Sequence, residues 1–154
     1  MKSEPSTFGI GHLARLPRQT AAWDGVRNYQ ARNLLRDRFR VGDRCFFHHS
    51  SCDEPGIQGT MEVVRAGYPE PADPRWIQVD VRLLERFARP VTLAMLREHE
   101  RGALASLIVL RRGNRLSVTP VSAAEWKFIH RLARAASGPR ASRAQSRATT
   151  VCNP

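Results

Sequence analysis

The chain has 154 residues, of which 42% are apolar, and it carries a formal net charge of +11. This length predicts one domain with a single hydrophobic core, and the sequence contains no apolar run of about 18 residues that would predict a membrane-spanning helix. Cys45, Cys52 and Cys152 form no Cys-x-x-Cys pair. This odd number of unpaired cysteines argues against a disulfide scaffold. Since we also find no secretion signal, we expect a cytoplasmic location, which is compatible with association with the nucleoid.

The positive charge is almost entirely arginine. Of the 25 basic residues, only Lys2 and Lys127 are lysines, and residues 131–154 contain five arginines and no acidic residue, which leaves a net charge of +6 on residues 1–130. Arginine contacts phosphate with two N–H groups at once and stacks on bases, so this bias suits a nucleic-acid partner. A genome rich in arginine codons explains the bias equally well.

Strand and helix signals alternate from the first residue. Residues 1–4 predict a short strand that ends at Pro5. A helix is expected over residues 6–16, because apolar residues recur at helical spacing until Pro17, and a second one over residues 29–37.

Longer strands dominate the middle of the chain. Strands are expected over residues 44–50, 57–65, 76–87 and 115–121. Thr92 is the expected cap of a helix that runs to about residue 99, and Ser122 with Glu125 forms a capping box for a last helix over residues 123–135. Several strands interrupted by short helices predict an α+β domain built on a mixed, curved or barrel-like sheet. We expect this domain to span residues 1–136, followed by a disordered basic tail over residues 137–154, which are polar and lack aromatic residues.

The stretch over residues 23–33 is the strongest candidate for a binding site. A pocket for a flat, polar base needs an aromatic wall and a few directed polar groups. Trp23 or Tyr29 can supply the wall, and the side-chain amides of Asn28 and Asn33 can both donate and accept hydrogen bonds. The alternative is a well-packed turn with Trp23 in the core.

Other polar groups can face the same ligand. Glu4, which follows Lys2 and Ser3, can accept a hydrogen bond from the exocyclic amine of a base, although a plain surface strand end explains this segment too. Three arginines are candidate phosphate ligands, and simple solvation is the alternative for each: Arg27, Arg32 and Arg115.

The spacing of Cys45, His48, His49 and Cys52 superficially resembles a zinc cluster. On a strand, Cys45 and His49 share one face while His48 points to the other, so the four side chains cannot converge and we expect no metal site. Ser50 beside His49 suggests a nucleophile with its base, but no third group that would orient the histidine is specified. No phosphate-binding or dinucleotide-binding glycine motif occurs, and we expect no cofactor.

Six blocks of sequence follow one another between Met1 and about Leu132. They are KSEP, WDGVRNYQARN, HSSC with PGI-x-G and EVVR, YP, PRW-x-QVDV, and RRGNRLSVTPVS-x-x-EW. Together they resemble the EVE domain, the family of thymocyte nuclear protein and of many small bacterial relatives. The chain departs from this family pattern twice. Relatives usually carry a few more apolar and aromatic residues before KSEP. They also carry a longer acidic segment between YP and PRW. In this chain only residues 70–74 separate Pro69 from Arg75, and they are a candidate for the pocket rim.

The resemblance implies a PUA-like fold related to YTH domains. It also implies a non-catalytic reader of a modified base, chiefly modified cytosine in DNA or alternatively modified RNA, held in an aromatic cage closed by polar contacts. The family motifs place the following residues near that cage: Lys2, Ser3, Glu4, Trp23, Val26, Asn28, Tyr29, Arg32, Asn33, His49 and Ser50.

We therefore expect a monomeric nucleic-acid-binding module in which Trp23 stacks on a flipped base. The base edge is expected to be read by Glu4, Asn28, Asn33 and Ser50. One alternative is a small hydrolase or base-modifying enzyme that uses Ser50 and His49, and another is a structural component of a larger nucleoprotein complex.

Overall fold

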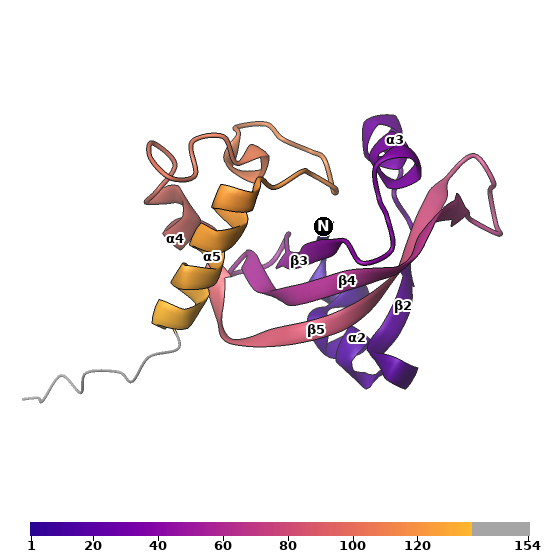
Figure 1. Ribbon diagram of the computed structural model, residues 1–154, viewed down its shortest axis with the longest axis horizontal. Helices are drawn as coiled ribbons and strands as arrows, with labels where there is room; N and C mark the ends of the chain where they lie inside the picture. Colours follow the sequence, from indigo (N-terminus) through magenta and orange to yellow (C-terminus); the bar gives the residue numbers. More distant parts are fainter. Residues whose placement is uncertain (137–154) are drawn as a thin grey trace, which may run out of the picture.

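The computed structural model describes residues 1–136, which form an open five-stranded sheet with helices on both sides (Figure 1). The strands are β1 (Lys2–Ser3), β2 (Thr20–Trp23), β3 (Arg44–His49), β4 (Gly56–Pro69) and β5 (Ile77–Thr92). The α-helices are α1 (Pro5–Phe8), α2 (Ile10–Arg15), α3 (Tyr29–Asp37), α4 (Leu93–Arg97) and α5 (Ala123–Ala136), with 3₁₀ turns at Pro17–Gln19 and Ile108–Leu110. The predicted tail over residues 137–154 lies outside the described residues. None of the described helices is long and apolar enough to cross a membrane.

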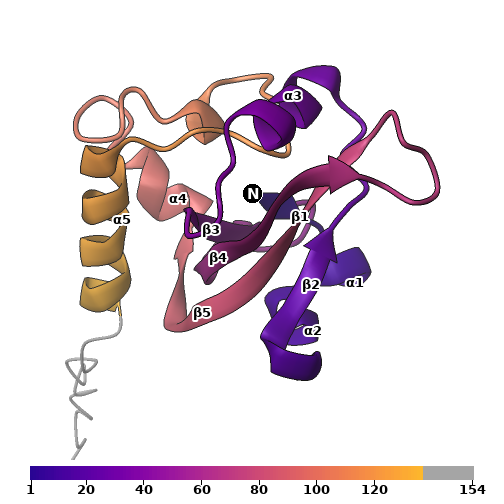
Figure 2. The ribbon, with the colours of Figure 1, turned by 45° about the vertical axis from the view of Figure 1, so that its right-hand side comes forward.

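The long hairpin of β4 and β5 is the centre of the sheet, whose strand order is β1-β3-β4-β5-β2. Only β1 runs parallel to its neighbour, β3, and the other pairs are antiparallel. Four register shifts along the β4–β5 ladder curve these strands, as Figure 2 shows. The predicted mixed, curved sheet of an α+β domain is confirmed. The sheet is not closed into a barrel, because β1 and β2 remain its two edges.

Two hydrophobic clusters flank the sheet, and β3 contributes to both. The Trp23 cluster contains Ile10, Leu13, Trp23, Leu35, Cys45, Phe47, Val63, Val79 and Val81. The Ile129 cluster contains Phe46, Ile57, Val91, Leu96, Leu104, Leu107 and Ile129. Successive residues of a strand point to opposite faces, so Cys45 and Phe47 belong to the first cluster and Phe46 to the second.

Local capping signals place several helices as predicted. Helix α3 begins and ends where its pattern predicts, and the Asn28 side chain caps it by accepting from the Ala31 N–H. The hydroxyl of Thr92 accepts from the Met95 N–H at 3.2 Å. Ser122 and Glu125 exchange the two hydrogen bonds of a capping box.

Two predicted elements are wrong, and one strand was missed. The helix expected over residues 6–16 is broken at Gly9, whose extended backbone ends α1 and whose N–H donates to the His12 ring at 2.8 Å. The strand expected over residues 115–121 is irregular, although the Ser117 carbonyl accepts from the Lys2 N–H at 2.7 Å. The Asn114 side chain accepts from the Leu116 N–H at 3.1 Å, a local hydrogen bond that competes with strand pairing. The missed strand is β2, which pairs with β5.

Helix α3 packs closely on β4 at Gly67. A Cβ atom at this glycine would lie 2.6 Å from the Leu35 carbonyl oxygen and 3.1 Å from the Arg36 Cα. We predict that Gly67→Ala lowers the free energy of unfolding by about 1–3 kcal/mol, because the helix must move away from the strand. Urea denaturation measures this change. The matched control is Gly102→Ala, whose Cβ would meet only the His99 carbonyl, at 3.9 Å. Equal stability of the two variants would contradict the prediction.

Candidate nucleic-acid interface

A small pocket of about 430 Å³ opens between the start of the chain and the segment that follows β2. We call it the Trp23 pocket. Five of the predicted site residues line it: Lys2, Ser3, Glu4, Trp23 and Val26. The segments around KSEP and WDGV are about 20 residues apart in the sequence and form its opposite walls. Phe8 and Ser117 complete the lining together with Thr7, Ala22, Asp24 and Gly25.

Trp23 belongs both to the hydrophobic core and to the pocket. Only 5% of its surface is exposed. Its ring packs edge-on against Phe47 at 5.2 Å and against Phe8 at 6.1 Å between centroids. These contacts fix the ring orientation, so any face that the indole presents to the pocket is a rigid one.

The loop after Trp23 is held by a buried carboxylate from a distant part of the chain. Gly25 has a φ of +70°, and its N–H donates to Glu70 at 2.9 Å. Arg27 donates to both oxygens of Glu70, at 2.8 and 2.7 Å, and its guanidinium lies 5.2 Å from the centre of the Trp76 ring. The hydrogen bonds from Arg27 lower the pKa of Glu70, although desolvation opposes this shift. Glu70 is 4% exposed and stabilises the Gly25–Val26 wall from behind.

Four further residues of the predicted site lie on or beside α3. Asn28 is the N-cap of the helix. Tyr29 is 58% exposed and packs on Trp76 with ring centroids 5.1 Å apart. Arg32 donates to the Asn33 side-chain oxygen at 3.0 and 2.7 Å, donates to the Arg75 carbonyl and lies over the Tyr29 ring. These side chains form an outer surface of stacked aromatic and guanidinium groups, and none of them lines the Trp23 pocket.

His49 is the last residue of β3, and Ser50 follows it. Both contact the first ten residues of the chain, which include the Lys2–Glu4 wall of the Trp23 pocket. The His49 Nε2 accepts from the Ile10 N–H at 3.0 Å, and burial lowers the pKa of its imidazole. The Ser50 N–H donates to the Ser3 carbonyl at 3.0 Å, and its hydroxyl lies 3.5 Å from the same oxygen. Within residues 1–136 these two side chains make no hydrogen bond to each other.

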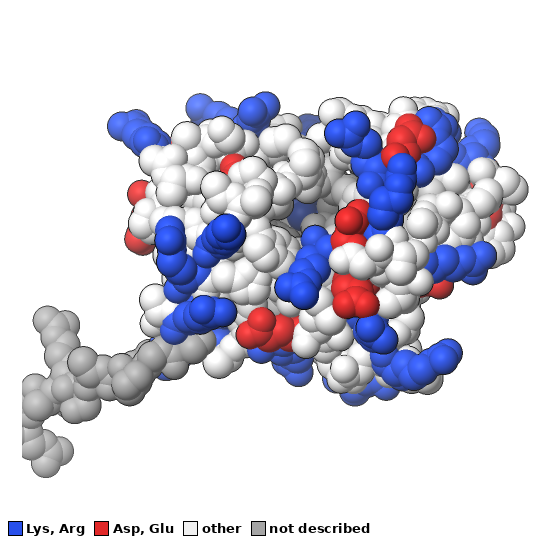
Figure 3. Space-filling model, in the orientation of Figure 1, with Lys and Arg blue, Asp and Glu red and all other residues white. Residues whose placement is uncertain are grey.

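Arg115 differs from Arg27 and Arg32 because its side chain is not engaged by protein acceptors within residues 1–136. It is exposed in the loop before Ser117, and it makes no hydrogen bond or ion pair to another residue of the range 1–136. Figure 3 shows a hollow near the middle of one face, with basic and acidic side chains beside it. The net positive charge of the chain attracts an anionic partner.

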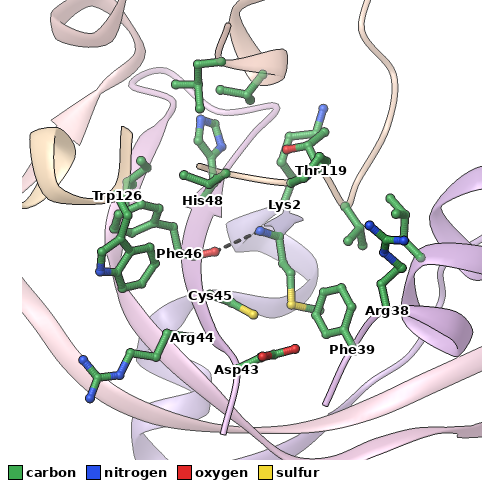
Figure 4. A pocket seen from close by; sticks show the side chains of 18 of the residues that line it. Lys2, Arg38, Phe39, Asp43, Arg44, Cys45, Phe46, His48, Thr119 and Trp126 are labelled. Carbon is green, nitrogen blue, oxygen red and sulfur yellow. Dashed lines mark hydrogen bonds between the residues drawn. The ribbon is translucent and has the colours of Figure 1, made fainter. Parts of the chain in front are cut away.

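The hollow leads to a second, larger pocket of about 920 Å³ between α3, β3 and α5. We call it the Met1 pocket; Figure 4 shows it from close by, with the Met1 amino group donating to the Phe46 carbonyl at 2.9 Å. Of the predicted site residues, only Lys2 and Asn33 line it. Lys2 therefore contributes to both pockets, and its burial lowers the pKa of its ammonium group.

The one cysteine and the two histidines of β3 do not form a cluster. Cys45 and His48 both line the Met1 pocket, and burial raises the pKa of the Cys45 thiol to about 11, whereas His49 contacts the start of α2. Across residues 1–136, no three or more cysteine, histidine or acidic side chains are grouped so that they could hold a metal ion.

Sequence reasoning missed Glu70 and Trp76 as supports of the site. Glu70 lies 43 residues from Arg27 in the short loop that the sequence predicts as a candidate pocket rim, but no local pattern marks its carboxylate as the partner of Arg27 and Gly25. Trp76 is the first residue of the strand predicted over residues 76–87 and part of the PRW block, but neither signal points to its contacts with Tyr29 and Arg27.

Comparison with known proteins identifies the fold family. The sequence model of the EVE domain matches residues 1–132. The chain belongs to the EVE domain family. It is 36% identical to thymocyte nuclear protein 1 from Homo sapiens and 38% identical to that from Danio rerio; both matches cover 84% of this chain, and 70% and 68% of the relatives, respectively.

Solved structures of relatives superpose on the whole domain. Human THYN1 in complex with 5-methylcytosine-containing DNA has a TM-score of 0.80 at 35% identity, over 86% of this chain and 95% of that one. A protein from Pseudomonas putida has a TM-score of 0.79 at 41% identity, over 86% and 97% of the two chains.

We predict that Glu70→Gln lowers the free energy of unfolding by about 1–3 kcal/mol. The amide can replace only part of the bonding to Arg27 and Gly25, and it removes the negative charge. Chemical denaturation at pH 7 measures the loss. The control is Glu62→Gln, which breaks the ion pair to Arg82 on the surface and should cost at most about 1 kcal/mol. Equal losses in both variants would contradict this assignment.

Replacing His48 should change how stability depends on pH. The ring is 5% exposed, neither of its nitrogens has a hydrogen-bond partner within residues 1–136, and burial lowers its pKa from 6.5 to about 4. Between pH 6.5 and 4, the imidazole of the unfolded chain binds a proton that the folded protein does not bind. The free energy of unfolding therefore decreases as the pH falls from 6.5 toward 4.

We predict that His48→Phe makes the decrease in the free energy of unfolding between pH 7 and 4 smaller, by up to about 3 kcal/mol. Denaturation curves of both proteins between pH 7 and 4 measure it. The lowered pKa values of His49 and His130 affect the wild-type protein and the variant alike. If the free energies of unfolding of the two proteins change in parallel with pH, the prediction is wrong.

Proposed function

We propose that this chain is a non-catalytic module that binds nucleic acid and holds a flipped, modified base in the Trp23 pocket. The observation that carries the proposal is the convergence of Lys2, Ser3 and Glu4 with Trp23 and Val26 around one small pocket. This pocket is lined by an aromatic ring together with charged and hydroxyl groups. Proteins use this combination to recognise a base that has been flipped out of its stack.

The family relationship supports the proposal. Human THYN1, whose fold and sequence resemble this chain over most of its length, was crystallised with DNA that contains 5-methylcytosine. We infer that modified cytosine in DNA is the preferred ligand class, with modified RNA as the alternative.

Different residues contribute to the base and to the backbone in this proposal. Trp23 supplies the stacking wall, and Glu4 accepts a hydrogen bond from the base edge. Arg115 contacts phosphate directly. Arg27 and Arg32 are already bound to protein acceptors, but a guanidinium has five N–H donors, so each retains donors for phosphate.

Asn28, Asn33 and Ser50 have a supporting part in this proposal. Their side-chain oxygens contact the Ala31 N–H, the Arg32 guanidinium and the Ser3 carbonyl, respectively. They keep the helix and the strand end in place behind the surfaces that the nucleic acid meets. Tyr29 and His49 have the same supporting part.

No specific observation favours the alternative enzyme based on Ser50 and His49. A serine nucleophile needs a base within hydrogen-bonding reach, and the His49 Nε2 is occupied by the Ile10 N–H. The binding module is therefore the function that the geometry supports best.

The proposal predicts that a duplex or single strand with 5-methylcytosine binds more tightly than its unmodified counterpart. We expect Glu4→Gln to weaken binding of the 5-methylcytosine strand about 5- to 100-fold, because a directed contact to a base edge is worth about 1–3 kcal/mol. Glu4 is exposed, so the variant should fold. Fluorescence anisotropy with labelled oligonucleotides at one fixed salt concentration measures both effects, and oxidised forms of the base complete the series.

Two variants separate base recognition from backbone attraction. Glu100→Gln removes an exposed carboxylate near α4 and should leave the preference unchanged. Arg115→Ala should weaken all oligonucleotides alike and make binding less sensitive to salt. If the protein binds modified and unmodified strands equally, or if Glu4→Gln and Glu100→Gln behave alike, the modified-base proposal fails.

A further inference from the structure

Phe8 is a partly buried aromatic residue of the Trp23 pocket. It is the last residue of α1, the short helix beside β2 (Figure 2), and it lines the pocket. Its ring lies 6.1 Å from the rings of both Trp23 and Phe47, measured between centroids, and stacks on His12 at 6.3 Å. Because three aromatic neighbours hold the ring, Phe8 presents a rigid apolar surface to a ligand.

The orientation of the Phe8 ring suits contact with the edge of a base. The planes of the Phe8 and Trp23 rings are inclined to each other by 84°. A base that stacks on Trp23 lies roughly parallel to the indole. Such a base is nearly perpendicular to the Phe8 ring, so it can meet that ring only with its edge, where the substituents that distinguish the bases are attached.

Glu4 and Phe8 are one helical turn apart. Glu4 is the N-cap of α1, and the Phe8 N–H donates to the Glu4 carbonyl at 2.8 Å. Residues four positions apart on a helix lie on the same face, with Cβ atoms about 5–6 Å from each other. The Glu4 side chain does not cap the helix, so its carboxylate is available to a ligand. A carboxylate and an aromatic ring are therefore neighbours at the pocket.

The order of groups around the ring of 5-methylcytosine matches this pair. The exocyclic amine is bonded to C4, the methyl group to the adjacent C5, and the ring nitrogen N3, a hydrogen-bond acceptor, lies on the other side of C4. When Glu4 accepts from the amine, one of its neighbours meets the methyl group and the other meets N3. Phe8 is apolar, whereas Lys2 and Ser3, which precede Glu4, carry hydrogen-bond donors. The methyl group thus faces Phe8.

We propose that Phe8 determines the specificity of the Trp23 pocket for the substituent at C5, through contact between its ring and the methyl group of 5-methylcytosine. This inference rests on the proposed function, in which a flipped cytosine stacks on Trp23 and bonds to Glu4. A carboxyl group at C5 is charged and would lie between an apolar ring and the Glu4 carboxylate, which disfavours its binding. The pocket therefore accepts a methylated cytosine and rejects a carboxylated one.

The test uses the full chain and single-stranded oligonucleotides that differ only in one central base, which is cytosine, 5-methylcytosine, thymine or 5-carboxylcytosine. Single strands avoid differences in base-pairing energy. Thymine carries the same methyl group as 5-methylcytosine but has an oxygen in place of the amine. The affinity ratio of 5-methylcytosine to cytosine therefore reports the methyl contact, and the ratio of 5-methylcytosine to thymine reports the contact to Glu4.

The wild-type protein should bind the 5-methylcytosine strand about fourfold more tightly than the cytosine strand, because one buried methyl group is worth about this factor. Phe8→Ala should bring this ratio below about twofold and leave the ratio of 5-methylcytosine to thymine unchanged, whereas Phe8→Leu, which keeps an apolar side chain, should keep most of the methyl preference. The 5-carboxylcytosine strand should bind the wild-type protein at least about fivefold less tightly than the 5-methylcytosine strand at neutral pH, because like charges repel.

Phe39→Ala is the matched control, because Phe39 packs against the same hydrophobic cluster but does not line the Trp23 pocket. It should change neither ratio, and circular dichroism establishes that the variants are folded. An undiminished methyl preference in a folded Phe8→Ala protein, or an equal loss of both ratios, would overturn the inference.

The carboxylated base provides a test that needs no variant. If the wild-type protein binds 5-carboxylcytosine as tightly as 5-methylcytosine, the inference is wrong even where Phe8→Ala does not fold. The proposed function fails separately, when the wild-type protein distinguishes 5-methylcytosine neither from cytosine nor from thymine. A wild-type preference for 5-methylcytosine that persists in Phe8→Ala contradicts only the assignment of Phe8.

Discussion

Strand β1 is only two residues long, and both pockets depend on how its backbone is held. On one edge it bonds to β3 through the His48 and Ser50 N–H groups, and on the other the Lys2 N–H donates to the Ser117 carbonyl at 2.7 Å. A strand this short has no stability of its own, so its neighbours fix its position. As a result, Lys2 lies between the two pockets and lines both, whereas Ser3 and Glu4 line only the smaller one.

The opposite wall of the Trp23 pocket has a separate support. Gly25 permits the left-handed turn after β2, but the turn alone does not determine where the wall lies. The buried Glu70 carboxylate does so by bonding to Gly25 and Arg27 at once. A buried carboxylate is stable only when it is paired and hydrogen-bonded, so the wall forms together with the β4–β5 hairpin whose connecting loop carries Glu70.

The range of each interaction explains what the sequence could predict. Helix α3, the Thr92 cap and the capping box at Ser122 depend on residues three or four positions apart, and their patterns are readable in one sequence. The prediction that the KSEP and WDGV segments lie near one pocket came from the family resemblance and not from the spacing of apolar residues. The irregular course of residues 115–121 accompanies a local bond from the Leu116 N–H to Asn114, and the role of Glu70 depends on a contact across 45 residues. The Met1 pocket likewise arises from segments that are far apart in the sequence.

The shared wall at Lys2 links the two pockets energetically. Burial lowers the pKa of this ammonium group, which means that the surrounding protein disfavours its charge. A negative group in either pocket stabilises the protonated form and also restricts the long side chain to that side. An anion bound in one pocket thus removes part of the attraction available to an anion in the other. By linkage this coupling is reciprocal, so an anion near Glu4 and an anion in the larger pocket would compete through the Lys2 side chain without touching each other.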